Sequence, residues 1–331
     1  MTRPEFVPPR WLAHRHLQSL IAGSAPRRAW MARRAVAMTR ASQELLLECG
    51  DGVRLQAFYS AQPHGGRDLA LLLHGWEGSV ESQYLLSTAS YLYDRGFEVI
   101  RLNFRDHGDT HHLNPELFHS CRIAEVVGAV AAVQQRFAGH RLSLAGYSLG
   151  GNFALRVAAR APAAGIRLTQ AVAVCPVLDP ARTLEVLETG LWIYRHYFVT
   201  KWRRSLRRKH AAWPDRYRLA ELLESRNLTR MTELLVVRYS GFPDLLSYLN
   251  GYAIVGAALA GLAVPSRIIA SLDDPIIPAR DLERIAASPS LEITAVGRGG
   301  HCGFLETLGG PTWADRQVHA TLAAAHGRAA E

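Results

Sequence analysis

A serine with glycine two residues away on each side stands at Gly146-Tyr147-Ser148-Leu149-Gly150, between a strand-like and a helix-like run. In a sharp strand-to-helix turn, a serine is held in a strained conformation that projects its hydroxyl group, and crowding favours glycine at both flanking positions. The start of the helix adds backbone N–H groups and the positive end of a dipole. The pattern therefore predicts that Ser148 is a nucleophile.

A second glycine-flanked loop follows an apolar run and reads His74-Gly75-Trp76-Glu77-Gly78. Attack by a serine on a carbonyl needs N–H donors aimed at the developing oxyanion. Where the nucleophile lies on such a turn, the next residue supplies one donor and an earlier strand-end loop supplies the other. We expect the backbone amides of Trp76 and Leu149 to form the oxyanion hole, with His74 orienting the loop.

A serine hydroxyl also needs a base, and the base needs a carboxylate to orient it. Among the histidines after Ser148, only His301 follows a late strand in a glycine-rich loop. Two adjacent aspartates, Asp273 and Asp274, follow the preceding strand, and only one of them can orient the imidazole. Asp274 is favoured because Pro275 begins a stiff loop directly after it, and Asp273 stays the alternative.

These residues follow runs that are typical of strands. A hairpin is predicted at 44–49 and 53–61, joined by Gly50-Asp51-Gly52. Continuous apolar runs then alternate with helix-like stretches. We expect strands at 69–73, 97–104, 142–145, 171–177, 266–271 and 291–296, and helices at 82–95, 122–137, 151–160 and 313–326. Strands that are apolar throughout imply a mostly parallel sheet with helices on both faces. With the chain order serine, acid, histidine, the predicted class is the α/β-hydrolase fold.

The alternation is interrupted at about 179–255, where the chain reads as helical, basic and aromatic. We expect this insertion to be a helical cap over the site of an α/β-hydrolase domain at 43–331. Residues 1–42 form a basic extension that should pack on the core. The cap aromatics Trp192, Tyr194, Tyr197 and Phe198, with Trp202, are predicted to line a pocket for an apolar acyl chain.

The net charge of +9 is concentrated at Arg27–Arg40 and Lys201–His210. The second run predicts a helix with Trp202, Ser205 and Leu206 on one face and a solvated basic face opposite. Peripheral contact with an anionic membrane is the alternative, whereas no motif for nucleic-acid binding accompanies the charge. No run resembles a signal peptide or a membrane span, so a cytoplasmic protein is expected.

Two other groups of side chains are given structural interpretations. The four cysteines, Cys49, Cys121, Cys175 and Cys302, lack paired spacing, which favours reduced thiols over a disulfide framework or zinc site. The polar loop after the strand at 97–104 contains possible metal ligands, namely Asp106, His107, Asp109, His111, His112 and, farther on, His119. We interpret them as shaping the rim of the pocket, and we expect no metal and no cofactor.

Beyond these motifs, the chain resembles the YheT-like α/β-hydrolases over nearly its whole length. Pro9-Arg10-Trp11 with His16-Leu17-Gln18-Ser19 is similar to their N-terminal signature, with Ser19 where threonine is usual. The nucleophile turn, Asp273-Asp274-Pro275 and Gly299–Phe304 match the later motifs. The loop Arg105–Asp109 departs from the usual Arg-Gly-x-x-Gly.

The resemblance implies hydrolysis of carboxylic esters, either short-chain esters or monoacylglycerol-like lipids, without a cofactor. Transfer of the acyl group to an alcohol is the rival reaction, because it uses the same acyl-enzyme. A non-catalytic lipid-binding protein on this fold is the rival of another class. The oligomeric state is left open.

Overall fold

The first two strands form the predicted hairpin at one edge of an eight-stranded sheet. In the computed structural model, which describes residues 6–327, β1 (Ser42–Glu48) pairs antiparallel with β2 (Arg54–Ser60), from Ser42 opposite Ser60 to Glu48 opposite Arg54. The turn residues Gly50, Asp51 and Gly52 all have positive φ angles, as a tight hairpin turn demands.

The other six strands are parallel to one another, so the prediction of a mostly parallel sheet is confirmed. The strand order is β1-β2-β4-β3-β5-β6-β7-β8, and β2 joins the parallel part by pairing antiparallel with β4. Their bounds are β3 (Asp68–Leu73), β4 (Glu98–Leu102), β5 (Arg141–Tyr147), β6 (Leu168–Val174), β7 (Ser266–Ser271) and β8 (Leu291–Val296).

Helices bury both faces of this sheet, as β3 illustrates. Leu69, Leu71 and Leu73 belong to one hydrophobic cluster, whereas Ala70 and Leu72 belong to another, because successive strand residues point to opposite faces. The first cluster includes side chains of α5 (Ile123–Arg136) and α6 (Leu149–Arg160), and the second those of α4 (Gln83–Tyr93) and α12 (Trp313–Ala325).

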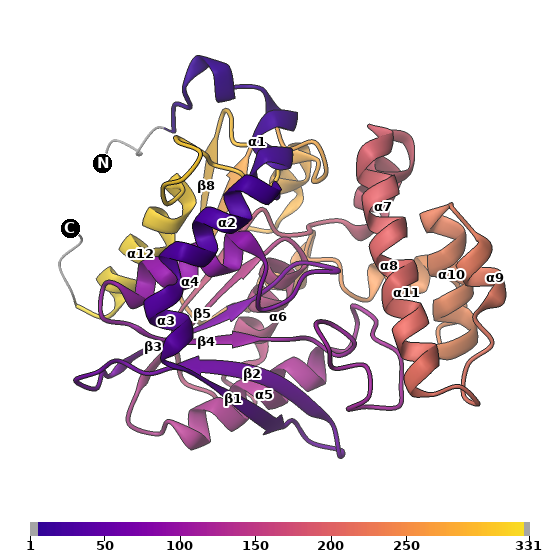
Figure 1. Cartoon of the computed structure of the whole chain (residues 1–331), viewed down its shortest axis with the longest axis horizontal. Helices are drawn as coiled ribbons and strands as arrows, with labels where there is room; N and C mark the ends of the chain where they lie inside the picture. Colours follow the sequence, from indigo (N-terminus) through magenta and orange to yellow (C-terminus); the bar gives the residue numbers. More distant parts are fainter. Residues whose placement is uncertain (1–5, 328–331) are drawn as a thin grey trace.

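The helical insertion stands beside the carboxyl end of the sheet (Figure 1). It contains α7 (Pro180–Thr189), α8 (Trp192–Ala212), α9 (Ala220–Glu224), α10 (Leu228–Tyr239) and α11 (Leu245–Asn250). Short 3-10 helices lie at η2 (Ala257–Leu259) and, after β7, at η3 (Ala279–Arg284). On α8, Trp202 and Leu206 are buried and Arg204 and Arg207 are exposed, whereas Lys209 is fully buried. The basic run is therefore only in part a solvated face.

The basic N-terminal segment is helical from residue 10 onward. It forms η1 (Arg10–Leu12), α1 (Arg15–Ala22), α2 (Ala25–Arg34) and α3 (Val36–Arg40), and it runs along the layer that contains α4 (Figure 1). Met31 and Met38 are buried in this layer, and the Arg27 guanidinium donates to the carbonyl oxygens of Leu308 and Gly310. Residues 1–5 of the expected extension lie outside the described residues. None of the described helices combines the length and the apolar character that a membrane span requires.

Candidate active site

Ser148 occupies the sharp turn between β5 and α6. Its φ and ψ angles are 52° and −119°, a strained conformation for a residue with a side chain. A Cβ atom at Gly146 would lie 2.2 Å from the carbonyl oxygen of Gly150, and one at Gly150 would lie 2.4 Å from that of His74. Both glycines are therefore required by close backbone packing.

His301 and Asp274 lie in line with this serine. The Nε2 atom of His301 is 3.1 Å from Ser148 Oγ, and its Nδ1 atom is 2.8 Å from Asp274 Oδ2. The other carboxylate oxygen of Asp274 accepts the N–H groups of Ile276 and Ile277 at 2.8 and 2.9 Å. With Nδ1–H donating to the carboxylate, Nε2 is free to accept the serine proton.

The neighbouring aspartate has a different set of contacts. Asp273 Oδ1 accepts the N–H of Gly300 at 2.9 Å and the hydroxyl of Ser271. It thereby ties the end of β7 to the loop that contains His301, without contacting the imidazole. Of the two carboxylates that the sequence left as alternatives, the structure places Asp274 against His301.

The electrostatic environment of His301 favours its protonated form. Burial by itself lowers the pKa of the imidazole, but the charges of Asp274 and Cys302 and their hydrogen bonds outweigh burial and raise the pKa well above its ordinary value. A raised pKa makes the neutral imidazole a stronger base. The neutral form of His301 is therefore well suited to accept a proton, and the carboxylate of Asp274 stabilises the imidazolium that results.

The loop with Trp76 is held from two sides. Gly75 N–H donates to the Tyr84 hydroxyl at 2.8 Å, and Glu77 N–H donates to His107 Nε2 at 3.2 Å. Among the described residues, none accepts a hydrogen bond from the intervening amide of Trp76. The same holds for the amide of Leu149 at the first turn of α6. Two donors are thus available at the positions expected for an oxyanion hole.

His74 has the structural role that the sequence predicted. Its Nε2 atom accepts the N–H of Phe104 at 3.2 Å, so Nδ1 carries the proton and donates to the carbonyl oxygen of Gly75 at 2.7 Å. Complete burial, with a smaller effect of nearby His107, keeps the pKa of His74 well below its ordinary value. A neutral imidazole therefore links the ends of β3 and β4.

Sequence reasoning missed the contact that holds the His301 loop from outside. Ser19, on α1, accepts the N–H of His301 with its hydroxyl oxygen at 2.8 Å and donates to the carbonyl of Arg15. Gln18 is fully buried, and its side-chain amide pairs with both the N–H and the carbonyl of Leu305. The motif His16-Leu17-Gln18-Ser19 was the available signal in the sequence, but it did not indicate that these residues contact the loop that contains His301.

The same helix also contacts the cap. His16 Nδ1 lies 2.9 Å from the hydroxyl of Tyr194 on α8. Burial, followed by the charges of Arg15 and His14, lowers the pKa of His16. Helix α1 therefore contacts both the loop with His301 and the first turn of the cap helix.

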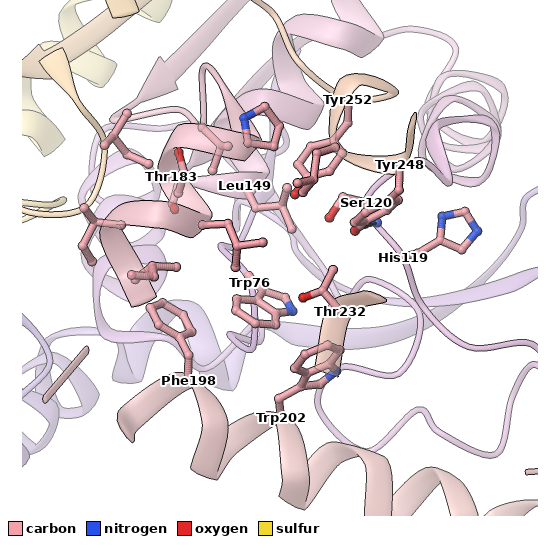
Figure 2. A pocket seen from close by; sticks show the side chains of 18 of the residues that line it. Trp76, His119, Ser120, Leu149, Thr183, Phe198, Trp202, Thr232, Tyr248 and Tyr252 are labelled. Carbon is pink, nitrogen blue, oxygen red and sulfur yellow. Dashed lines mark hydrogen bonds between the residues drawn. The ribbon is translucent and has the colours of Figure 1, made fainter. Parts of the chain in front are cut away.

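A cavity of about 90 Å³ opens beside Ser148 and Leu149, between the sheet and the cap. In Figure 2, Trp76 lies beside Phe198 and Trp202 in the cavity wall: its ring stacks on Phe198 at 5.0 Å between centroids and meets Trp202 edge-on at 5.2 Å. Most of the remaining lining is apolar and comes from the segment after β6, from α7 and α11 and from the segment after β7, with Val177, Pro180, Leu184, Leu187, Leu249, Ile276 and Ile277.

The predicted cap lining needs correction. Phe198 and Trp202 line the cavity because they are one helical turn apart on the inner face of α8. Trp192 and Tyr197 belong to other faces of the helix and are 62% and 50% exposed. Tyr194 is buried, but it faces His16 rather than the cavity.

The polar loop after β4 supports the cap. Asp106 pairs with buried Lys209 at 2.7 Å, and the ammonium group of Lys209 also donates to the carbonyls of Asn114 and Glu116. Burial raises the pKa of Asp106 to about 6, although the charge of Lys209 opposes the rise. Of the possible metal ligands in this part of the chain, Asp106 is thus occupied by an ion pair.

Comparison with known proteins places this architecture. The model of the α/β hydrolase fold family matches residues 70–308. The chain belongs to the α/β-hydrolase fold family. Its sequence is 26% identical over 305 residues to an Escherichia coli protein named "Putative esterase YheT", covering 91% of this chain and 87% of the relative. It is thus a YheT-like α/β-hydrolase, as its motifs indicated.

Other relatives of this α/β-hydrolase are more distant. The mouse protein named "Phospholipase ABHD3" is 21% identical over 250 residues, which cover 73% of this chain and 59% of that protein. Among solved structures, the Pyrococcus furiosus esterase Pf2001 superposes with a TM-score of 0.57 at 14% identity, covering 86% and 91% of the two chains. The carboxylesterase CesB of Bacillus subtilis gives 0.55 at 16% identity, covering 89% and 99%. These structural likenesses concern the fold.

Proposed function

We propose that this α/β-hydrolase is a serine esterase that cleaves carboxylic esters through an acyl-enzyme. The observation that carries the proposal is the continuous row of contacts from Ser148 Oγ through His301 to Asp274, at 3.1 and 2.8 Å, beside an apolar cavity. The order and spacing of the three groups are those that nucleophilic acyl transfer requires. The name of the Escherichia coli relative points to the same reaction class.

The reaction then has two steps. In the first, Ser148 attacks the ester carbonyl while His301 accepts its proton, and Asp274 stabilises the resulting imidazolium. The amides of Trp76 and Leu149 donate to the oxyanion, and His301 returns the proton to the departing alcohol. In the second, His301 activates water, which attacks the acyl-serine and releases the acid.

The substrate class follows from the cavity wall. The lining beside Ser148 is dominated by aliphatic and aromatic side chains, including Trp76, Phe198 and Leu187. Such a wall stabilises buried hydrocarbon by about 0.8 kcal/mol per methylene. We therefore assign an apolar acyl chain, from a short-chain ester or a monoacylglycerol-like lipid, to this cavity.

A fluorophosphonate probe tests the nucleophile directly, because it reacts with an activated serine hydroxyl. Wild-type protein should be labelled once, at Ser148, and Ser148→Ala should lose both the label and ester hydrolysis, the latter by about 10³-fold or more. Folded wild-type protein that takes up no label would overturn the proposed enzyme activity.

A series of p-nitrophenyl esters from acetate to decanoate tests the acyl site. Rates should vary with chain length and pass through a maximum, since the cavity is bounded. Equal rates across the series would refute the assignment of an acyl chain to this cavity.

Added ethanol or glycerol tests whether water is the acyl acceptor. Free acid should remain the main product; ester formation in its place would identify an acyltransferase.

A further inference from the structure

Two cysteine thiols lie close to each other and to the imidazole of His301. Cys175 follows the end of β6, and Cys302 follows His301 in the chain. One ligand atom from each of Cys175, Cys302 and His301 lies within 4.8 Å of the other two. The two cysteines are far apart in the sequence and lack the paired spacing of a metal or disulfide motif, so their meeting is a product of the fold.

The backbone holds both cysteines in an unusual conformation. Cys175 and Cys302 have φ angles of 44° and 56°, a region that residues with a side chain seldom adopt. Each thiol is directed at the segment of the other: Cys175 Sγ lies 3.9 Å from the carbonyl of Gly300, and Cys302 Sγ lies 3.9 Å from that of Val174. Both cysteines are free and buried, so the two sulfurs are oriented toward each other without a covalent bond.

Two sulfurs and one imidazole nitrogen are a donor set that Zn²⁺ prefers. At Zn–S distances of about 2.3 Å, two sulfurs on a tetrahedral zinc are about 3.8 Å apart. The three ligand atoms of this cluster lie within 4.8 Å of one another. The two sulfurs would therefore need to close by about 1 Å at most, and a sulfur and the imidazole nitrogen, about 3.5 Å apart on a tetrahedral zinc, by about 1.3 Å at most.

We propose that Cys175, Cys302 and His301 form a binding site for one thiophilic divalent cation such as Zn²⁺. Binding forms two metal–sulfur bonds and one metal–nitrogen bond, and the two thiols release two protons to solvent. A water molecule completes the tetrahedron. No electron is transferred, and no further reactant is needed.

Occupation of this site would switch off the proposed esterase. Both nitrogens of His301 are engaged, one with Asp274 and one with Ser148. A cation that takes either nitrogen removes the orienting carboxylate or the acceptor of the serine proton. The inference about inhibition rests on the proposed function, whereas the inference about binding does not.

Cobalt(II) provides a probe that is independent of activity, because a thiolate bound to it produces a charge-transfer absorption in the near ultraviolet. Full-length reduced protein should bind one Co²⁺ per chain with this absorption, and Zn²⁺ should displace it. Cys175→Ala and Cys302→Ala should each weaken binding at least tenfold. Ser148→Ala should retain the absorption, which separates metal binding from hydrolysis.

The chain offers a matched control in Cys49 and Cys121, its other two cysteines, which lie outside the cluster. The variant Cys49→Ala/Cys121→Ala should bind Co²⁺ as the wild type does. Cys175→Ser keeps the size of the side chain, and its loss of the absorption in a protein with an unchanged melting temperature excludes misfolding. Wild-type protein without the absorption, or with an absorption that persists in both single alanine variants, would overturn the proposal.

Inhibition is measured in parallel with p-nitrophenyl butyrate. Saturating Zn²⁺ should lower the wild-type rate at least tenfold, and EDTA should restore it. In the presence of the same Zn²⁺ concentration, the hydrolysis rate of Cys175→Ala should stay within twofold of the rate that this variant has without metal. If Co²⁺ binds as described but Zn²⁺ leaves hydrolysis unchanged, the cation does not engage His301 and the three-ligand site is refuted.

Discussion

The contact between Ser19 and His301 allows a quantitative test of how the N-terminal helix contributes to activity. The Ser19 hydroxyl accepts the backbone N–H of His301 at 2.8 Å and is itself oriented by the carbonyl of Arg15. Ser19→Ala removes the acceptor and leaves this part-buried N–H without a protein partner. The cost of an unpaired donor is about 1–3 kcal/mol, and partial access to water favours the lower half of that range.

We expect the loss of this hydrogen bond mainly to lower the turnover number, kcat. A loss of about 1.4 kcal/mol corresponds to a tenfold decrease in rate, because the loop with His301 is then less firmly held against Ser148. KM should change little, since Ser19 is not among the residues that line the cavity. The optimum pH should shift only slightly, because Asp274 still contacts the imidazole.

The assay compares kcat and KM of wild type, Ser19→Ala and Ser19→Thr with a p-nitrophenyl ester. Ser19→Thr keeps the hydroxyl and should recover most of the rate, whereas a purely structural effect would not depend on it. Ser24→Ala is the matched control, since Ser24 starts α2 without a side-chain capping bond. A kcat of Ser19→Ala within twofold of the wild type, or a rise in KM with unchanged kcat, would refute the reasoning.

Three further outcomes are expected. The pKa of His301 is raised, and only the neutral imidazole accepts a proton, so the rate of hydrolysis should rise with pH through a midpoint above 6.5. Asp274→Asn should shift that midpoint to lower pH. A wild-type midpoint below 6.5 would contradict this reasoning. Lys209→Ala leaves Asp106 as a buried carboxylate without its cationic partner. Urea denaturation should then show a free energy of unfolding that is lower by about 3–5 kcal/mol. A change below 1 kcal/mol would show that this ion pair does not stabilise the fold. Phe198→Ala removes the ring stacked on the Trp76 indole and should shift the preferred ester toward longer acyl chains; an unchanged preference across the ester series would show that this ring does not bound the cavity.

The central sheet could be predicted closely because its physical signal is local. Strands β7 and β8 have the predicted bounds, 266–271 and 291–296, since an apolar run between turn residues is typical of a strand buried on both faces. The strand expected at 97–104 ends earlier, at Leu102, because Asn103 already leaves the parallel ladder, and its side-chain carbonyl accepts the N–H of Val80. An apolar residue such as Phe104 also packs well in a loop, so hydrophobicity alone cannot mark where a strand ends.

The N-terminal helices and the cap lining were harder to predict for a common reason. Helix α2 is strongly basic, and its few apolar residues, Met31 among them, become a buried face only against α4. On α8, Phe198 and Trp192 are both aromatic, but only Phe198 turns toward the cavity. Which face of a helix is inward depends on the elements that surround it, and those elements are distant in the chain.

The sequence by itself determined the turn at Ser148, the order of serine, acid and histidine, and the alternation that builds the sheet, because each depends on backbone conformation within a few residues. Only the tertiary structure decided between Asp273 and Asp274, since two adjacent carboxylates differ in direction and not in spacing. It also brought Ser19 to the amide of His301 from 282 positions away. Contacts of that range follow from the packing of whole elements, which no local pattern of residues encodes.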